Sequence, residues 1–275
     1  MDAPPLVIEP GRAERTYWRD LWRYRELFVV LAWRDVVVRY KQTVIGLAWV
    51  LLQPLATVLV LTVVFGRVAG LPTAGDAPYA LLVLAGVLPW QLFATALTGA
   101  SQSLVGNANL ISKVYFPRLI VPASAVVVAL VDLLVSLVIL MAALAWYGDT
   151  PGWRILTLPA FVAMAFLASL GPGLFLAALN VTYRDFRYVI PFVVQFGVYV
   201  SPVGFTSGVV PERWRLIYAL NPMVGVIDGF RWAILGEDAA LHLPSFAVSG
   251  MMIGGLLWLG IRRFRATERT VADLV

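Results

Sequence analysis

The sequence predicts an all-α membrane protein with six transmembrane helices. Its 275 residues are 60% hydrophobic and only 13% charged, which is about half the charged share of a soluble domain. Six apolar stretches of low charge are each long enough for one crossing, which takes about 20 residues. Such a chain has too little polar surface for water, so we expect lipid to be its main solvent.

The predicted spans follow one another along a single domain. Pro54 and the sequence Gly171-Pro172-Gly173 are expected to bend or loosen their helices, which membrane spans tolerate when neighbours satisfy the freed backbone groups. Only Asp132 places a charged side chain deep inside a span. The spans are residues 44–65, 79–100, 119–146, 155–179, 189–206 and 243–261.

The distribution of positive charge predicts the orientation. Most of the 21 lysines and arginines lie in the N-terminal segment, in the connections 102–118 and 182–188, and in the tail from Arg262. Because positive residues stay on the inner side of a membrane, we expect both termini in the cytoplasm. Basic residues at the ends of apolar segments suit anionic lipid headgroups, so nucleic acid is not an expected partner.

Two further segments are predicted to lie on the cytoplasmic side without spanning. Residues 16–41 mix tryptophans and tyrosines with arginines, a composition typical of a helix at the membrane surface. A plain membrane anchor is the alternative. In residues 102–118 the apolar side chains are interrupted by Asn107, Asn109 and Lys113. This pattern indicates a short helix that docks on something, or an ordinary connection.

A third segment, residues 211–236, is predicted on the outer side. It is apolar but broken by Asn221-Pro222, and it carries Asp228 and Arg231. These two charged residues are three apart on a helix and could pair. Irregular backbone is allowed at membrane depth when protein buries it. A re-entrant helical hairpin is therefore one reading, and a pair of surface helices is the other.

The sequence also excludes several kinds of chemistry. It contains no cysteine and one histidine, His242, which excludes thiolate and multi-histidine metal sites. Its only lysines are Lys41 and Lys113, and neither lies in a GxxxxGK[ST] phosphate-binding loop. We therefore expect no ATP hydrolysis in this chain, no catalytic site and no metal.

Several residues are candidates for contact with a transported molecule. Asp132 faces a water-filled path or pairs with a polar group on another helix. Two aromatic stripes could stack on sugars or be ordinary packing residues, since their members share a helix face. Two arginines could contact a lipid pyrophosphate or simply anchor the chain in headgroups. The stripes are Trp90 with Phe93 and Phe192 with Phe196 and Tyr199, and the arginines are Arg184 and Arg187.

Four motifs resemble the permease subunits of ABC-2 type exporters. They are RDVVVRYKQTVIGLAWVLLQPL (34–55), NANLISKVYFPRLIVPAS (107–124), NVTYRDFRYVIPF (180–192) and YALNPMVGVIDGFRWAILG (218–236). The branch that they resemble most is that of the O-antigen, capsular polysaccharide and teichoic acid export permeases. The resemblance runs from about residue 17 to residue 263.

This resemblance implies a permease in the bacterial inner membrane that moves a lipid-linked polysaccharide through a channel between two subunits. It implies a homodimer with two copies of a separate cytoplasmic ATPase, which would bind ATP and Mg²⁺. It divides the chain into a tail with an interface helix (1–43), a transmembrane domain (44–262) and a second tail (263–275). Within the domain, residues 103–117 would be a coupling helix and 211–236 an outer re-entrant pair.

The resemblance also suggests roles for particular residues. An exporter of a small drug or lipid, or a non-transport subunit of a glycan synthase, remains an alternative function. The expected ATPase-docking residues are Trp33, Arg34, Arg39, Asn107, Leu110, Ile111, Lys113, Phe116 and Pro117. The aromatic stripes and Asp132 would lie along the substrate channel, and the expected outer gate consists of Asn221, Pro222, Asp228 and Arg231.

Overall fold

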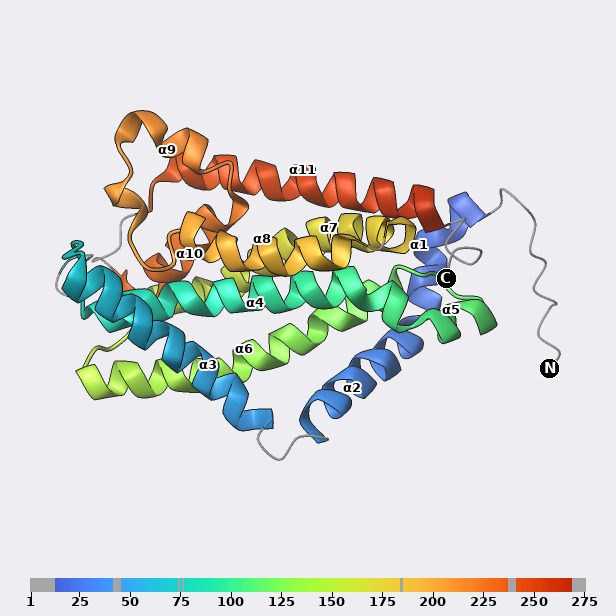
Figure 1. Ribbon diagram of the computed structural model, residues 1–275, viewed down its shortest axis with the longest axis horizontal. Coiled ribbons are helices and arrows are strands. Elements are labelled where there is room, and N and C mark those ends of the chain that lie inside the picture. Colours follow the sequence, from blue (N-terminus) through green and yellow to red (C-terminus); the bar gives the residue numbers. More distant parts are fainter. Residues whose placement is uncertain are drawn as a thin grey trace.

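The computed structural model describes residues 13–41, 46–73, 75, 77–183, 185–236 and 241–268. Over these residues the chain is an elongated helical bundle without strands (Figure 1). This confirms the predicted fold class. Residues 1–12 and 269–275, which are parts of the two predicted tails, and Arg184 lie outside the described residues.

The helices follow the predicted order. Five stretches are long and apolar enough to cross a membrane, namely Ala48–Val68, Tyr79–Gly106, Ile120–Tyr147, Trp153–Thr182 and Leu243–Glu268. The elements are α1 (Ala13–Arg23), α2 (Arg25–Lys41), α3 (Gly46–Leu61), the π-helix η1 (Thr62–Val68), α4 (Tyr79–Gly106), α5 (Ala108–Lys113), α6 (Ile120–Tyr147), η2 (Trp153–Thr157), α7 (Leu158–Thr182), α8 (Phe186–Val200), η3 (Ser207–Val209), α9 (Glu212–Tyr218), α10 (Pro222–Leu235) and α11 (Leu243–Glu268).

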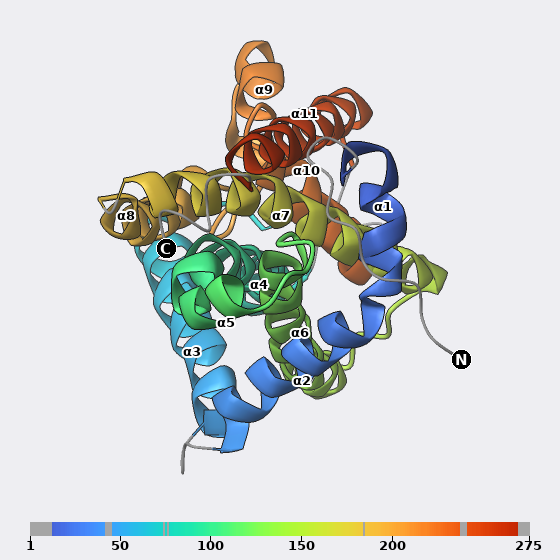
Figure 2. The same ribbon diagram turned by 90° about the vertical axis from the view of Figure 1, so that its right-hand side faces the viewer.

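Helix α4 lies at the centre of the bundle. Every residue from 81 to 90 is buried, as expected for a helix that is apolar on all sides. Figure 2 shows α3, α6, α7 and α8 around α4, with α1 and α2 along the outer edge. Most of the main core is therefore arranged around this one helix.

The α7–α11 contact depends on glycines. A methyl group on Gly260 would collide with the backbone carbonyl of Gly171, and one on Gly171 would lie 2.7 Å from the backbone nitrogen of Leu257. Small residues of this kind let membrane helices approach closely. Helix α7 runs without a break through Pro172, so the flanking glycines serve close packing rather than an interruption of the helix.

The described chain starts and finishes at the same end of the bundle. The Tyr17 hydroxyl in α1 donates to Glu268 Oε1 at the end of α11, at 3.4 Å. We call this the α5 end and the opposite one the α9 end (Figure 1). This placement agrees with an even number of crossings, while the side that faces the cytoplasm stays a prediction.

The fifth span was predicted too long. Helix α8 has 15 residues and ends at Val200, so residues 201–206 are not part of it. The Arg231 guanidinium donates to the carbonyls of Val203 (2.9 Å) and Phe205 (2.8 Å) in the turn that follows. It also donates to the carbonyl of Leu82, at 3.1 Å. The bonds to Val203 and Phe205 give these two carbonyls of the turn a donor inside the protein, where an unpaired carbonyl would be unfavourable.

We predict that Gly260→Ala destabilises the protein because the added methyl group meets backbone that has no room to move. Overpacking of this kind costs about 1–3 kcal/mol. The measurement is the Tm of the purified protein in detergent. Gly254→Ala in the same helix is the control, since a methyl group there meets open space. An equal Tm for the two variants would contradict the close contact.

Candidate functional site

A second apolar cluster lies at the α5 end, separate from the main core. It joins α1, α2, α5 and the beginning of α6 to the long helices α4, α7 and α11. Burial of these side chains removes apolar area from water and holds the elements together. Its buried members are Tyr17, Leu31, Leu104, Ile111, Phe116, Leu119, Ile120, Val121, Leu174, Ala177, Ala178 and Phe264. The short helices at this end therefore form one packed unit with the bundle.

Part of the predicted docking surface of the α5 segment is turned toward the bundle. Ile111 is 5% exposed and Phe116 is 4% exposed, and Pro117 is also buried while Leu110 is half-buried. In the single chain these side chains are therefore not exposed for docking, and their contact with an ATPase stays a prediction. They hold α5 and the following turn against the bundle, and Leu110 packs against the same cluster.

The exposed side of this segment carries different residues. Tyr115 is 59% exposed and Val114 is 49% exposed, and both follow directly after the exposed Lys113. Of these three, only Lys113 was identified from the sequence. The signal in the sequence is the phenol hydroxyl of Tyr115 next to the wholly apolar Phe116, since the polar member of such a pair is the one expected to face outward.

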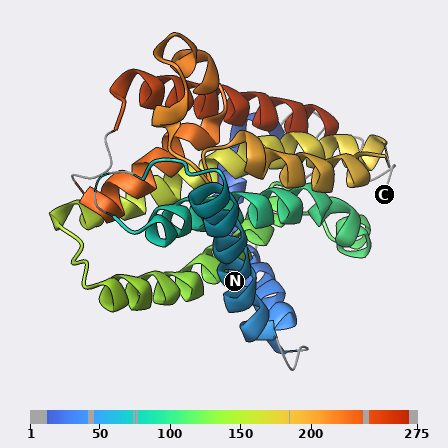
Figure 3. The ribbon, with the colours of Figure 1, turned by 60° about the vertical axis from the view of Figure 1, so that its left-hand side comes forward.

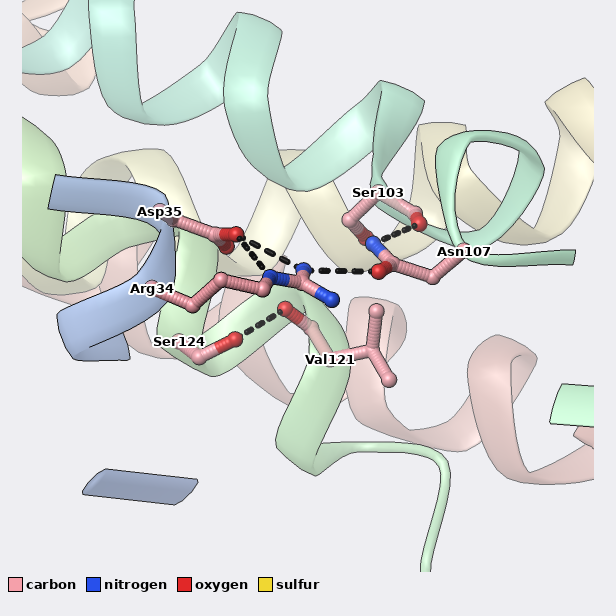
Figure 4. A network of polar contacts seen from close by, with 6 residues as sticks. All are labelled: Arg34, Asp35, Ser103, Asn107, Val121 and Ser124. Atoms are coloured by element: carbon pink, nitrogen blue, oxygen red, sulfur yellow. Dashed lines mark hydrogen bonds and ion pairs between the residues drawn. The ribbon is translucent and has the colours of Figure 1, made fainter. Parts of the chain in front are cut away.

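Helix α2 is joined to α5 by a polar contact (Figure 4). Arg34 Nη2 donates to Asn107 Oδ1 at 2.7 Å, and the same guanidinium forms an ion pair with Asp35, also at 2.7 Å. Asn107 Nδ2 donates to the Ser103 carbonyl at the end of α4, at 2.9 Å. Asn107 therefore links α2 to the junction between α4 and α5. Trp33, next to Arg34, is exposed.

A second polar junction ties α1 to the end of α11 and the beginning of α6. Glu268 Oε1 accepts from the Arg118 backbone N–H at 2.8 Å, and the Arg118 guanidinium donates to the Glu268 carbonyl. Arg265 lies over the Tyr17 ring, 4.9 Å from its centroid. Burial and the nearby Glu268 raise the pKa of the Tyr17 phenol. This junction joins residues about 150 and 250 positions apart and was missed from the sequence.

The charge inside the third span has two partners in α2. Asp132 Oδ2 forms an ion pair with Arg39 Nη2 at 2.6 Å, and Asp132 Oδ1 accepts from the Tyr40 hydroxyl at 2.5 Å. The Asp132 side chain is only 14% exposed. Burial and the bond to Asp132 raise the pKa of the Tyr40 phenol. The geometry favours the pairing alternative, and it directs Arg39 toward α6 rather than toward a docking partner.

Both predicted aromatic stripes exist, in different surroundings. Trp90 and Phe93 are buried, with ring centroids 5.3 Å apart, and the Trp90 indole packs against Gly197 of α8. The second stripe lies on the exposed side of α8, where two of its rings are 4.3 Å apart. Only the second stripe is open to contact, and its members are Phe192, Phe196 and Tyr199.

At the α9 end, α9 lies against α11, whereas α10 packs into the bundle against α4, α7 and α11 (Figure 3). We refer to these two consecutive helices as the α9–α10 pair. Asn221 caps α10 by accepting from the Met223 N–H at 3.0 Å, and Pro222 takes the first helical position. Asp228 and Arg231 are buried, but within the described residues no ion pair joins them. The predicted pairing is corrected, because the three backbone carbonyls take up the Arg231 guanidinium instead.

The remaining arginine candidate is exposed. Arg187 lies over the ring of its neighbour Tyr188, 5.2 Å from the centroid. Arg184 lies outside the described residues. Contact of either arginine with a lipid pyrophosphate stays a prediction.

Comparisons with known proteins agree with the resemblance. The family described as "ABC-2 type transporter" matches residues 26–235. An O-antigen export system permease protein RfbA of Myxococcus xanthus is 27% identical over 259 residues, covering 94% of this chain and 98% of that protein. A protein of the same name from Klebsiella pneumoniae is 28% identical over 210 residues, covering 75% of this chain and 79% of that protein. The polysialic acid transport protein KpsM of Escherichia coli is 23% identical, covering 82% and 89%.

We predict that Arg39 and Asp132 behave as one unit in a double-mutant cycle. Arg39→Leu removes the ionic partner of a largely buried carboxylate, whereas the double variant Arg39→Leu/Asp132→Leu removes both charges. Breaking a buried pair destabilises more than replacing it. Because Arg39 is partly exposed, solvent screening reduces the coupling to about 1–2 kcal/mol.

The measurement is the Tm of the wild type, both single variants and the double variant in detergent. Arg39→Leu should have a lower Tm than the double variant. Arg23→Leu, an exposed change in α1, is the control and should change the Tm little. Additive effects of Arg39→Leu and Asp132→Leu would show that the two side chains do not depend on each other.

Proposed function

The chain belongs to the ABC-2 type transporter family, and we propose that it is the permease subunit of an exporter of a lipid-linked polysaccharide. The observation that carries this proposal is the alignment with the O-antigen export permease of Myxococcus xanthus over 98% of that protein's length. An alignment of this extent includes the spans, the α5 segment and the α9–α10 pair together. The relatives named for capsule export support the same class of substrate.

We propose that a separate ATPase supplies the energy. The sequence has no phosphate-binding loop, so ATP and Mg²⁺ would be bound by that partner, in two copies. The docking surface that we propose is the exposed side of the α5 end, at Trp33, Lys113, Val114 and Tyr115. An exposed aromatic and apolar surface of this kind suits a protein partner.

Two contacts provide a route by which this partner would act on the spans. A push on α5 reaches α2 through the Arg34–Asn107 hydrogen bond. Helix α2 in turn reaches the middle of α6 through the Arg39–Asp132 pair. Movement of α5 would therefore be transmitted to a long helix without any direct contact between that helix and the ATPase.

The proposed assembly is a homodimer in the bacterial inner membrane, with the α5 end and both termini in the cytoplasm. Among the apolar surfaces of the described residues that are open for a second copy or for lipid, two are of interest here. One is on α3 and the other is on α8, and they include Leu52, Leu55, Leu59, Phe192, Phe196 and Tyr199. Glycan would pass between the two copies, along the α8 aromatic rings and out past the α9–α10 pair.

Deletion of this gene in the native host tests the proposed function. We expect lipid-linked polysaccharide to accumulate inside the cell and surface polysaccharide to be lost. The measurement is the amount of glycan in the inner membrane and on intact cells, with the restored gene as the control. Normal surface glycan would contradict the proposal. Absence of glycan from both places would indicate a role in its synthesis, and a defect confined to drug or lipid efflux would indicate the smaller substrates.

A further inference from the structure

A cavity of about 240 Å³ lies between α2, α3, α4 and α6. Its walls carry polar groups from all four helices. Arg39 and Asp132 form its charged side, and the indole of Trp49 is exposed beside it. The other polar members are Gln53, Gln91, Thr95 and Ser136.

The depth of these groups makes them unusual. Gln53, Gln91 and Asp132 each lie near the middle of a predicted span, far from both ends. A polar side chain at this depth is unfavourable unless it has a partner, and it usually marks a functional path. Asp132 has two partners in α2, and the Ser136 hydroxyl donates to the Asp132 carbonyl at 2.8 Å.

The two glutamines and the threonine lack such partners. Among the residues that the structure describes, the side chains of Gln53, Gln91 and Thr95 make no hydrogen bond. Two amides and a hydroxyl therefore face a common cavity with unused donors and acceptors. Gln53 is exposed and Gln91 and Thr95 are half-buried, so their polar atoms are open to a ligand that enters the cavity.

The charge of the cavity narrows the class of ligand. Arg39 and Asp132 neutralise each other, so neither a free anion nor a free cation finds an excess of opposite charge there. Amides and hydroxyls both donate and accept, which suits the hydroxyl groups of an uncharged molecule. The Trp49 ring offers an apolar surface on which the C–H face of a sugar can pack. The volume is below that of pockets for drug-sized ligands, and it suits a single ring.

We propose that this cavity is a subsite for one uncharged sugar ring of the exported glycan. Gln53 and Gln91 bind the ring hydroxyls from opposite helices, and Trp49 packs against the ring. This inference rests on the proposed export function and adds a position and a preference for neutral sugars. Because Arg39 belongs to α2, the cavity also has a wall that is connected through Arg34 to the α5 segment.

The double variant Gln53→Leu/Gln91→Leu tests the subsite in cells that lack the wild-type gene. Leucine fills similar space and suits an apolar span, so we expect normal membrane levels and an unchanged Tm. Loss of two hydrogen bonds should slow the appearance of surface polysaccharide about tenfold. The matched control is Thr57→Val/Thr98→Val, which removes one hydroxyl from each of the same two helices. Both of those hydroxyls bond to their own backbone.

Trp49→Leu is a second variant that removes the exposed ring without disturbing the core. It should also reduce the rate, while the threonine control should not. Wild-type rates for both the glutamine variant and Trp49→Leu would overturn the subsite. If the gene deletion itself left surface glycan normal, the proposed function would fail instead.

Native mass spectrometry tests the other possible occupant of the cavity, a lipid headgroup. A phospholipid that is retained by the wild type and lost from the glutamine variant, with unchanged export, would assign the cavity to a lipid headgroup and overturn the sugar.

Discussion

The contact between the end of α2 and the middle of α6 is centred on a single carboxylate, that of Asp132. A charged group midway along a membrane helix needs partners, because lipid offers none. Arg39 and Tyr40 provide them with contacts of 2.6 and 2.5 Å. Both residues lie in the last turn of α2, so this pairing brings the end of α2 against the middle of α6. The rest of α2 then runs toward the α5 end, where Arg34 meets Asn107.

The same constraint accounts for the opposite end of the molecule. Backbone carbonyls that leave a helix inside a bundle need donors just as a buried charge does. Arg231 provides donors for Val203 and Phe205 in the turn after α8, and it also donates to Leu82 of α4. A short α8 and a buried α10 follow from that arrangement. Arg39 thus binds α6 at its middle and Arg231 binds two other elements near the α9 end, while the apolar core supplies most of the packing between them.

Much of the fold could be predicted from the sequence because apolar length and charge position determine membrane spans directly. The order of the helices and the placement of both ends on one side follow from these properties. Contacts between distant residues could not be predicted in the same way. Tyr40 and Asp132 are 92 residues apart in the sequence, and spacing along the chain carries no information about such a pair. The early end of α8 likewise depends on Arg231, which is 26 residues from Phe205.

The candidate site was likewise predicted only in part from the sequence. The sequence indicated that the α5 segment has an apolar side, but it did not show which way that side faces. Ile111 and Phe116 turn inward and Tyr115 turns outward. The exposed residues that carry the proposed docking surface were therefore partly missed, whereas Arg34 and Asn107 were identified and prove to contact each other. The chain has no natural cysteine, so this surface is open to a direct measurement.

The most direct test of the account is the reactivity of one introduced thiol, that of Tyr115→Cys, toward a membrane-permeant maleimide in inside-out membrane vesicles. With the permease alone, the thiol should react quickly. With the partner ATPase bound, the rate should fall several-fold, while Leu216→Cys in α9 at the opposite end, a second exposed position, should react at the same rate with or without the ATPase. An unchanged rate at Tyr115→Cys in vesicles that retain the ATPase would contradict docking at the α5 end.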